Sequence, residues 1–251
     1  GRLYQSYNLS FMEPWLGGKK PNSFSASVYR SIMTNGYKKS NSNFGSMVID
    51  GASIGLGKRL AWPDDYFSLY GELSYQRYKL NDYSYYRFLF SDGTSNLLSF
   101  TTRLTRFSTS PNLIYPRSGS TFTLSVQATP PYTLISGKNM IGLPDKEKYN
   151  WIEFHKWTFK ADYFYPISND DKFVLNAKFA FGYLGYYNKD IGPSPFENFY
   201  LGGSGMTGYS LYGREIIALR GYTDGSVTPT DPRTGAPTGN VYSKMTCELR
   251  Y

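Results

Sequence analysis

The sequence predicts an all-β protein, and more narrowly an antiparallel transmembrane β-barrel. Apolar and polar residues alternate with a period of two along segment after segment, as in strands with one apolar and one polar face. The intervals between these segments alternate between short and long. Aromatic residues make up 18% of the 251 residues, and many stand near the predicted strand ends. No apolar run approaches the roughly 18 residues that a membrane helix needs, and the mean hydropathy of -0.45 fits strands whose two faces average out.

Four strands are predicted in the first half of the chain. In the third of them, Ala52, Ile54 and Leu56 alternate with small residues such as Ser53 and Gly55. This alternation predicts that successive side chains point to opposite faces of a sheet. The four strands cover residues 7–11, 23–28, 51–57 and 67–76, and they are joined by a turn at 13–18, a polar loop at 34–44 and a turn at 62–65.

Five further strands are predicted in the second half. The alternation is clearer here, and in the last strand Val241, Met245 and Leu249 oppose Lys244 and Glu248. The five strands cover residues 98–104, 122–128, 156–163, 173–181 and 241–250, and the intervals before and between them fall at 81–94, 115–119, 130–148, 168–171 and 187–240.

The order of turns and loops is typical of an outer-membrane barrel, which has short periplasmic turns and long extracellular loops. This rule places the loop at 187–240 on the extracellular side. Aromatic residues near the strand ends are expected to form girdles at the two membrane interfaces. A water-soluble sandwich or barrel also alternates, with its apolar face inside, and is the alternative fold. The predicted girdle residues are Tyr29, Tyr75, Tyr78, Trp151, Trp157, Tyr163, Tyr165 and Tyr183.

Nine predicted strands indicate part of a larger barrel. An antiparallel meander with an odd strand count cannot pair its first strand antiparallel to its last, and bacterial single-chain barrels have even counts. Strand edges exposed to lipid are also forbidden. We therefore interpret residues 1–251 as one partial outer-membrane β-barrel domain and expect the other strands elsewhere in a longer protein. Two open edges further predict that this piece would not fold alone.

The longest interval without a predicted strand, residues 187–240, holds the stretch around which the chain is organised. A loop of this length without regular structure is usually functional or disordered. The part at 195–222 is too rich in aromatic and aliphatic residues to be disordered. We therefore expect it to pack against the rest of the barrel.

Few residues could support catalysis or metal binding. His155 is the only histidine and Cys247 the only cysteine, which excludes a site built on two or more His or Cys ligands. The stretch 203–208 matches G-x-G-x-x-G, but it lacks the preceding strand and following helix that this nucleotide-binding motif requires. The Asp pairs at 64–65 and 170–171 lie in short turns, where Asp is favoured for local hydrogen bonds. We therefore predict no catalytic residue, no metal, no cofactor and no enzymatic activity.

The formal net charge of +8 would suit anionic lipid headgroups or nucleic acid. The basic residues are scattered, however, so a solvated basic surface accounts for the charge equally well. The tyrosine-rich stretch 83–87 could stack on bases, but it lies in a predicted extracellular loop, so we expect no nucleic-acid partner. Lys156, Lys160, Lys178 and Lys244 are predicted to line a lumen, either as a substrate path or as simple solvation of its wall.

Motifs in the long loop and in two turns follow one another in a specific order. The loop holds Pro-Phe-Glu-Asn-Phe-Tyr-Leu-Gly-Gly at 195–203 and Leu-Arg-Gly-Tyr at 219–222, the turn at 115–120 reads Tyr-Pro-Arg-Ser-Gly-Ser, and Glu-Pro-Trp-Leu stands at 13–16. In combination these resemble the sixth extracellular loop, a turn between strands eight and nine, and the end of strand four in the BamA family of outer-membrane protein assembly insertases. The resemblance implies strands four to twelve of a sixteen-strand barrel, with residues 204–218 as an insertion in the loop.

The resemblance also implies a site. In that family the loop folds back into the lumen and its arginine contacts acidic residues of the inner wall. A guanidinium buried in a lumen needs a planar acceptor, which a carboxylate supplies. Glu248 faces inward by the alternation and matches the family's glutamate on strand twelve, so an ion pair between Arg220 and Glu248 is expected.

The other residues of the implied motifs have local roles. Gly221 is expected to permit a close backbone approach or a positive φ, and Tyr222 is expected to pack against the lumen wall. The motif residues also include Leu219 in the loop tip, Phe199, Tyr200, Gly202 and Gly203 at the loop base, and Pro116, Arg117 and Gly119 in the periplasmic turn.

The function that the resemblance implies is that of the central subunit of the outer-membrane protein assembly machinery, which folds and inserts β-barrel proteins into the bacterial outer membrane. Its partners would be unfolded outer-membrane protein clients, accessory lipoproteins and outer-membrane lipids. In the family, the seam between the first and last strands opens and templates incoming strands, a form of β-augmentation. Those seam strands and the N-terminal periplasmic domains are not in this chain. The alternatives are a two-partner-secretion-type polypeptide transporter of the same superfamily and a passive porin-like channel with a constriction loop.

Overall fold

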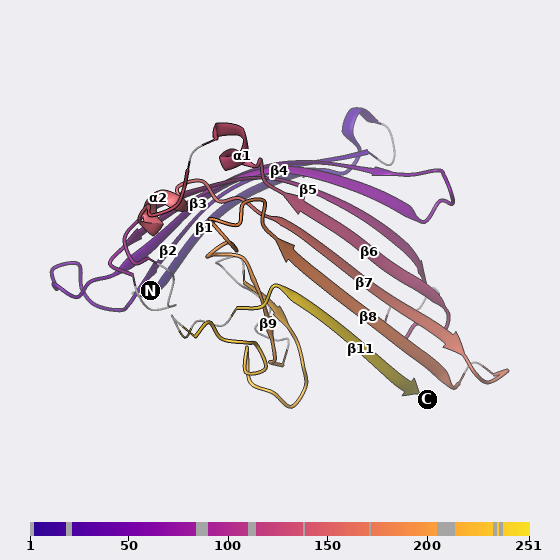
Figure 1. Cartoon of the computed structure of the whole chain (residues 1–251). Helices are drawn as coiled ribbons and strands as arrows, with labels where there is room; N and C mark the ends of the chain where they lie inside the picture. Colours follow the sequence, from indigo (N-terminus) through magenta and orange to yellow (C-terminus); the bar gives the residue numbers. More distant parts are fainter. Residues whose placement is uncertain are drawn as a thin grey trace.

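Nine antiparallel strands form one arched sheet, which confirms the predicted fold class (Figure 1). The computed structural model describes residues 3–18, 22–83, 90–109, 114–137, 139–170, 172–204, 214–232, 235 and 238–251. Each strand pairs with its neighbour in the chain up to the eighth, and the last strand pairs with the eighth. The strands are β1 (Tyr4–Glu13), β2 (Asn22–Thr34), β3 (Ser46–Arg59), β4 (Phe67–Asn81), β5 (Gly93–Thr109), β6 (Gly119–Ala128), β7 (His155–Pro166), β8 (Val174–Gly185) and β11 (Val241–Arg250).

The sheet is open, with β1 at one edge and β11 at the other (Figure 1). Its register keeps apolar residues of neighbouring strands on the same face, because partners such as Ala26, Ile54 and Leu73 lie opposite one another. These side chains point outward, and 54% of Ile54 and 46% of Leu73 are exposed. The alternation predicted from the sequence therefore sets which side chains point outward and which line the concave face.

The core lies on the concave face, near the ends of the strands where the long loops emerge. Two residues predicted to belong to the aromatic girdles are found there instead. Tyr78 is 1% exposed, and Tyr29 is partly buried against the same cluster. Both stand at inward positions of their strands, so the girdle prediction is wrong for them. The buried residues of this cluster include Met33, Met47, Ile49, Leu80, Leu97, Phe154, Leu184, Phe196, Phe199 and Tyr242.

Short elements occupy the long connections. Two helices, α1 (Tyr132–Ser136) and α2 (Asp145–Lys148), lie in the connection between β6 and β7, and a 3-10 turn, η1 (Leu16–Gly18), lies between β1 and β2. The described residues contain no helical segment that could span a bilayer. The loop at 187–240 was expected to hold no strand, and it contains two, β9 (Asn198–Leu201) and β10 (Arg214–Ile217). Each has only four residues, too few for alternation to reveal.

Glycine allows close packing where the long loop meets the sheet. Gly182 on β8 lies opposite Tyr242 on β11, and both are at inward positions. A Cβ atom on Gly182 would overlap the ring of Tyr242 and lie 2.8 Å from Cζ of Phe199 in the loop. The absence of a side chain therefore makes room for two aromatic rings on the concave face.

We predict that Gly182→Ala destabilises the barrel by about 1–3 kcal/mol, because the added methyl group overpacks this contact. Gly71→Ala is the matched control, since the nearest atom to its new methyl group would be Cζ of Phe100 at 3.7 Å. Urea unfolding of the full-length barrel in lipid vesicles measures both variants. Equal midpoints for the two variants would contradict the close contact at Gly182.

Candidate functional site: docking of the long loop on the inner wall

The long loop folds back beneath the arch of the sheet, where β9 lies beside β11 (Figure 1). β9 and β10 pair in parallel, with Phe199 opposite Glu215 and Leu201 opposite Ile217. The segment that leads back to β11 is also bonded to β9, because the amide of Phe199 donates to the carbonyl of Gly239 at 2.8 Å. The loop is therefore a hydrogen-bonded unit of its own.

The two sequence motifs of the loop meet each other. Gly203 forms an antiparallel bridge with Leu219, whose amide donates to the Gly203 carbonyl at 3.0 Å. The amide of Gly203 donates to the carbonyl of Tyr222 at 2.9 Å, and the Tyr222 amide closes a turn onto the carbonyl of Leu219 at 3.2 Å. The base motif at 199–203 thus holds the tip motif at 219–222 through backbone hydrogen bonds.

Glycine is required at the junction of these motifs. Gly202 and Gly203 have φ values of 127° and 103°, which side chains disfavour. A Cβ on Gly202 would also overlap the carbonyl oxygen of Thr223, and one on Gly203 would overlap the carboxylate of Asp224. Gly221 has φ of 89° but open space around it, so of the two roles predicted for it the positive φ is confirmed.

Two phenylalanines anchor the loop to the concave face. Phe196 stacks on Tyr78 of β4 with ring centroids 4.5 Å apart. Phe199 meets Tyr242 of β11 edge to face at 4.8 Å. Both phenylalanines are no more than 2% exposed. Fully burying such a side chain contributes about 1.5–3 kcal/mol, so these rings fix the loop against strands from both halves of the sheet.

Four charged side chains join the loop to β7. The ammonium of Lys156 lies 3.2 Å from a carboxylate oxygen of Glu197 and 3.2 Å from one of Glu215. Lys160, two positions further along the same face, lies 3.0 Å from the other oxygen of Glu215. The side chains of Lys156 and Glu197 are 12% and 7% exposed, whereas that of Lys160 is 57% exposed. The buried pair therefore carries more of the interaction than the exposed one.

The two carboxylates of the loop differ in their acidity. Burial raises the pKa of Glu197 above its ordinary value, despite the opposing effect of Lys156. Burial also acts to raise the pKa of Glu215, but the ammonium groups of Lys156 and Lys160 outweigh it and lower that pKa. Glu215 is thus the carboxylate whose charge the site holds most firmly.

The inner wall beside this cluster is polar. A hollow of about 600 Å³ adjoins Glu215, and its lining includes Glu72, Arg103 and Gln127 together with Lys156 and Lys160. The ammonium of Lys244, on β11, donates to the carbonyl of Ala218 in the loop. Three of the four lysines predicted to line the lumen therefore lie at the loop or beside it; the fourth, Lys178, stands at an inward position nearer the turn that follows β7.

The predicted ion pair between Arg220 and Glu248 is not formed. Arg220 is exposed and takes part in no ion pair among the residues that the structure describes. Glu248 does stand at an inward position, but its carboxylate pairs with Arg250 of the same strand at 3.2 Å. Tyr222, which was expected to pack against the wall, is 55% exposed. The wall meets the loop through lysines instead, so the charges are reversed relative to the prediction.

The remaining candidate residues have local structural roles. In the turn at 116–119, Gly119 has φ of 99° and begins β6, where a Cβ would overlap the carbonyl of Ser108. Nδ1 of His155 accepts a hydrogen bond from the indole of Trp157 at 3.1 Å, on the outward face. Asp64 pairs with Arg106 at 3.0 Å.

Some predicted motifs lie partly outside the described residues. These are the G-x-G-x-x-G match beyond residue 204, the tyrosine-rich stretch 84–87, and the second residue of the Asp pair at 170–171. Among the residues that are described, no group of three or more His, Cys, Asp or Glu side chains could hold a metal ion.

The sequence reasoning missed Glu197 and Glu215 as site residues. The sequence offered a weak signal, because an inward position alone does not show that Lys156 is buried. Its neighbours on β6 and β8, Gln127 and Leu184, supply no carboxylate, so a carboxylate partner could come only from outside these paired positions.

Comparison with known proteins places the chain in a family. The model of the Omp85 superfamily domain matches residues 1–251. The crystal structure of BamA from Haemophilus ducreyi lacking POTRA domains 1-3 has the same fold, with a TM-score of 0.66 and 19% sequence identity. The match covers 98% of this chain and 44% of that one, so the chain spans less than half of its length. No curated protein sequence matches the chain.

We predict that Glu215→Gln loosens the loop more than Glu197→Gln at pH 7. Glu215, whose pKa is lowered, stabilises the docked loop above the ordinary carboxyl pKa of about 4.3, and this stabilisation is lost as the pH falls through the lowered value. Glu197, whose pKa is raised, stabilises docking at low pH, and this stabilisation is lost as the pH rises. Loss of a charged hydrogen bond at Glu215 costs about 2 kcal/mol, roughly a thirtyfold rise in loop opening.

Hydrogen exchange of the loop amides in the full-length barrel measures this opening. As the pH falls, the difference between wild type and Glu197→Gln should change at a higher pH than the difference between wild type and Glu215→Gln, because burial raises the pKa of Glu197 and the two lysines lower the pKa of Glu215. Equal opening of the two variants at pH 7, or the reverse order, would contradict the assignment.

Proposed function

We propose a function from the premise that this chain belongs to the Omp85 superfamily, whose domain model it matches over its whole length. Members of this superfamily act in the insertion or transport of proteins at the outer membrane, and the chain has the fold of their β-barrel. Within that frame we propose that it forms wall and lumen plug of a barrel that folds and inserts other outer-membrane β-barrel proteins.

The docked loop is the observation that supports this role. It is held against the concave face by two buried aromatic anchors and by the cluster of Lys156, Lys160, Glu197 and Glu215. A passive channel needs an open, water-filled lumen. Here the loop covers part of the inner wall, and its carboxylates pair with the wall lysines. This favours a plugged barrel that acts through its strands and not through an open pore.

The chemistry that we propose is non-covalent. Strands at an opened barrel seam present free N–H and C=O groups, and an incoming strand can pair with them by β-augmentation. Such pairing needs no catalytic residue and no cofactor. The partners would be unfolded outer-membrane protein clients, accessory lipoproteins of an assembly complex and outer-membrane lipids. The part played by this chain would be to keep the wall rigid and the lumen closed while the seam opens.

A second candidate function is the passage of a polypeptide through the pore, as in secretion transporters of the same superfamily. The polar hollow of about 600 Å³ beside Glu215 favours it, because a lumen lined by Arg103, Gln127 and lysines could solvate an extended chain. The two candidates differ in what release of the loop should do. Release of the loop from the wall would reduce the activity of an insertase, whereas it would open the pore of a transporter.

The experiment is a charge exchange between wall and loop in the full-length protein, with Lys160→Glu and Glu215→Lys made singly and together. Each single change should place like charges together, free the loop and reduce assembly of client barrels in cells severalfold. The double variant restores opposite charges across the contact of 3.0 Å but leaves the new ammonium beside Lys156, which lies 3.2 Å from Glu215 in wild type, so both should recover in part. Lys178→Gln is the control, since this inward lysine makes no ion pair with the described part of the loop.

Client assembly in cells, the barrel's own heat-modifiable mobility and conductance in planar bilayers are scored together. Insertase function predicts that the single variants lose assembly and gain conductance. If the single variants assemble clients normally while wild type already passes large, steady, ion-selective currents, the protein is a passive channel. If the single variants gain polypeptide export without losing client assembly, the transporter function replaces the proposed one.

A further inference from the structure

A basic row crosses the outward face of three neighbouring strands. The register places Arg30 of β2 opposite Asp50 of β3, and Asp50 opposite Arg77 of β4. Lys79 stands two residues further along β4, on the same face and nearer the loop end. These four residues, named here the basic row, carry three positive charges and one negative charge on a wall that otherwise faces lipid.

Most of this positive charge is unpaired within the protein. Arg30 pairs with Asp50 at 3.3 Å, and their side chains are 58% and 46% exposed. Arg77 and Lys79 are exposed, and neither takes part in an ion pair among the described residues. The basic row therefore has a net charge of +2 open to the membrane.

The basic row lies at the edge of the apolar band. The three outward rows below it on β2–β4 carry no charge, and the next charge on β3 is Lys58, eight residues after Asp50. Eight residues rise about 27 Å along a strand and about 20 Å in a barrel with tilted strands, which is close to the roughly 25 Å apolar band of membrane barrels. The long loops emerge at the end where the basic row lies, so this edge is the extracellular one.

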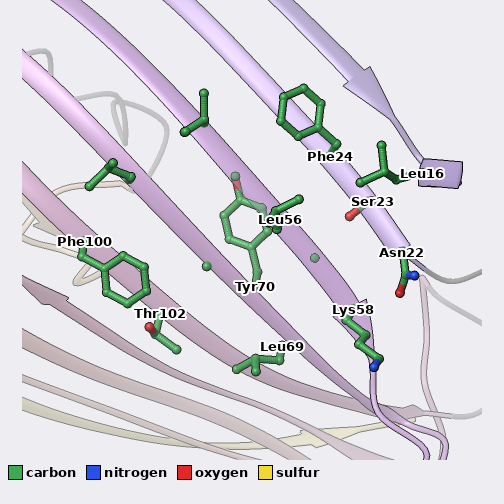
Figure 2. Close-up of a pocket in the computed structure, with 15 residues that line it drawn as sticks. Leu16, Asn22, Ser23, Phe24, Leu56, Lys58, Leu69, Tyr70, Phe100 and Thr102 are labelled. Atoms are coloured by element: carbon green, nitrogen blue, oxygen red, sulfur yellow. The ribbon is translucent and has the colours of Figure 1, made fainter.

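Apolar hollows run down from the basic row. The upper hollow, of about 440 Å³, lies over the small residues Ala26 and Ala52 and is flanked by Leu9, Tyr75 and Leu98. It shares Ile54 and Leu73 with a lower hollow of about 670 Å³. Figure 2 shows side chains of this lower hollow, including Leu56, Leu69 and Phe100. Gly71 is also among the residues that line it. Together these adjoining apolar hollows, which share Ile54 and Leu73, are named here the furrow.

We propose that the basic row and the furrow bind one phosphorylated glycolipid of the outer leaflet, with its phosphates on Arg30, Arg77 and Lys79 and an acyl chain in the furrow. Guanidinium groups bind phosphate oxygens bidentately, and an ammonium adds a point charge. Each cation near a membrane surface contributes about 1 kcal/mol toward an anionic lipid. The net charge of +2 matches a headgroup that bears more than one phosphate.

The position of the furrow supports a bound lipid over a general surface attraction. Small residues lower the wall within the apolar band below the basic row. Ala52 is the next outward residue after Asp50, and Ala26 and Gly71 stand two and three outward positions from Arg30 and Arg77. A headgroup held by the basic row therefore has its chain guided along β3 and β4. Cations without a furrow would attract any anionic lipid without selecting its chains.

The test uses the full-length barrel, because two edges of this sheet are open. Native mass spectrometry measures binding of lipopolysaccharide, of its dephosphorylated form and of phosphatidylglycerol, with inorganic phosphate as competitor. The triple variant Arg30→Gln, Arg77→Gln, Lys79→Gln should lose about fivefold in affinity for lipopolysaccharide per cation removed. Ala52→Phe, which fills the upper hollow, should lose affinity while keeping every charge. Lys172→Gln is the control, an exposed cation in the turn between β7 and β8 that lines neither hollow.

Wild type should bind lipopolysaccharide more tightly than phosphatidylglycerol, and inorganic phosphate should not displace it. The dephosphorylated glycolipid should bind wild type and the triple variant alike. Equal affinity of wild type and the triple variant for lipopolysaccharide would overturn the proposal, as would an equal loss in Lys172→Gln. Heat-modifiable mobility shows whether each variant is folded. If the triple variant does not fold, Lys79→Gln alone, at an exposed position, tests the contribution of a single cation.

Discussion

The position of the long loop depends on one electrostatic constraint, the burial of Lys156 on the concave face. A lysine that is 12% exposed needs carboxylate partners, because an isolated buried ammonium costs several kcal/mol. The sheet does not provide a carboxylate at the paired positions, and the loop provides two, Glu197 and Glu215. The loop that covers Lys156 therefore also supplies the carboxylates that burial of its ammonium requires.

The apolar contacts and the backbone of the loop agree with that constraint. Glu197 lies between Phe196 and Phe199, so the residue that pairs with Lys156 is flanked by the two rings that pack on Tyr78 and Tyr242. Aromatic burial supplies most of the free energy of docking, and the charge cluster selects the register at which the loop docks. The glycines at the base then allow backbone hydrogen bonds to hold the tip motif.

Period-two alternation was enough to predict the sheet, because each strand has one face in lipid and the other toward the lumen. The same rule placed Lys156, Lys244 and Glu248 on the inner face correctly. It could not predict what those residues contact, because that depends on a loop without periodicity. Tyr78 was assigned to a girdle by residue type although its position is inward, and the partner of Glu248 was taken from a resemblance although Arg250 stands beside it.

The most direct measurement is a double-mutant cycle on Lys156→Met and Glu215→Gln, read as the free energy of loop opening from hydrogen exchange in the full-length barrel. Docking through the wall lysine predicts a coupling energy of about 1–3 kcal/mol between the two changes, because either one alone removes their contact at 3.2 Å. Changes that add independently, with a coupling near zero, would show that the loop is held by its aromatic anchors and that the charge cluster does not position it.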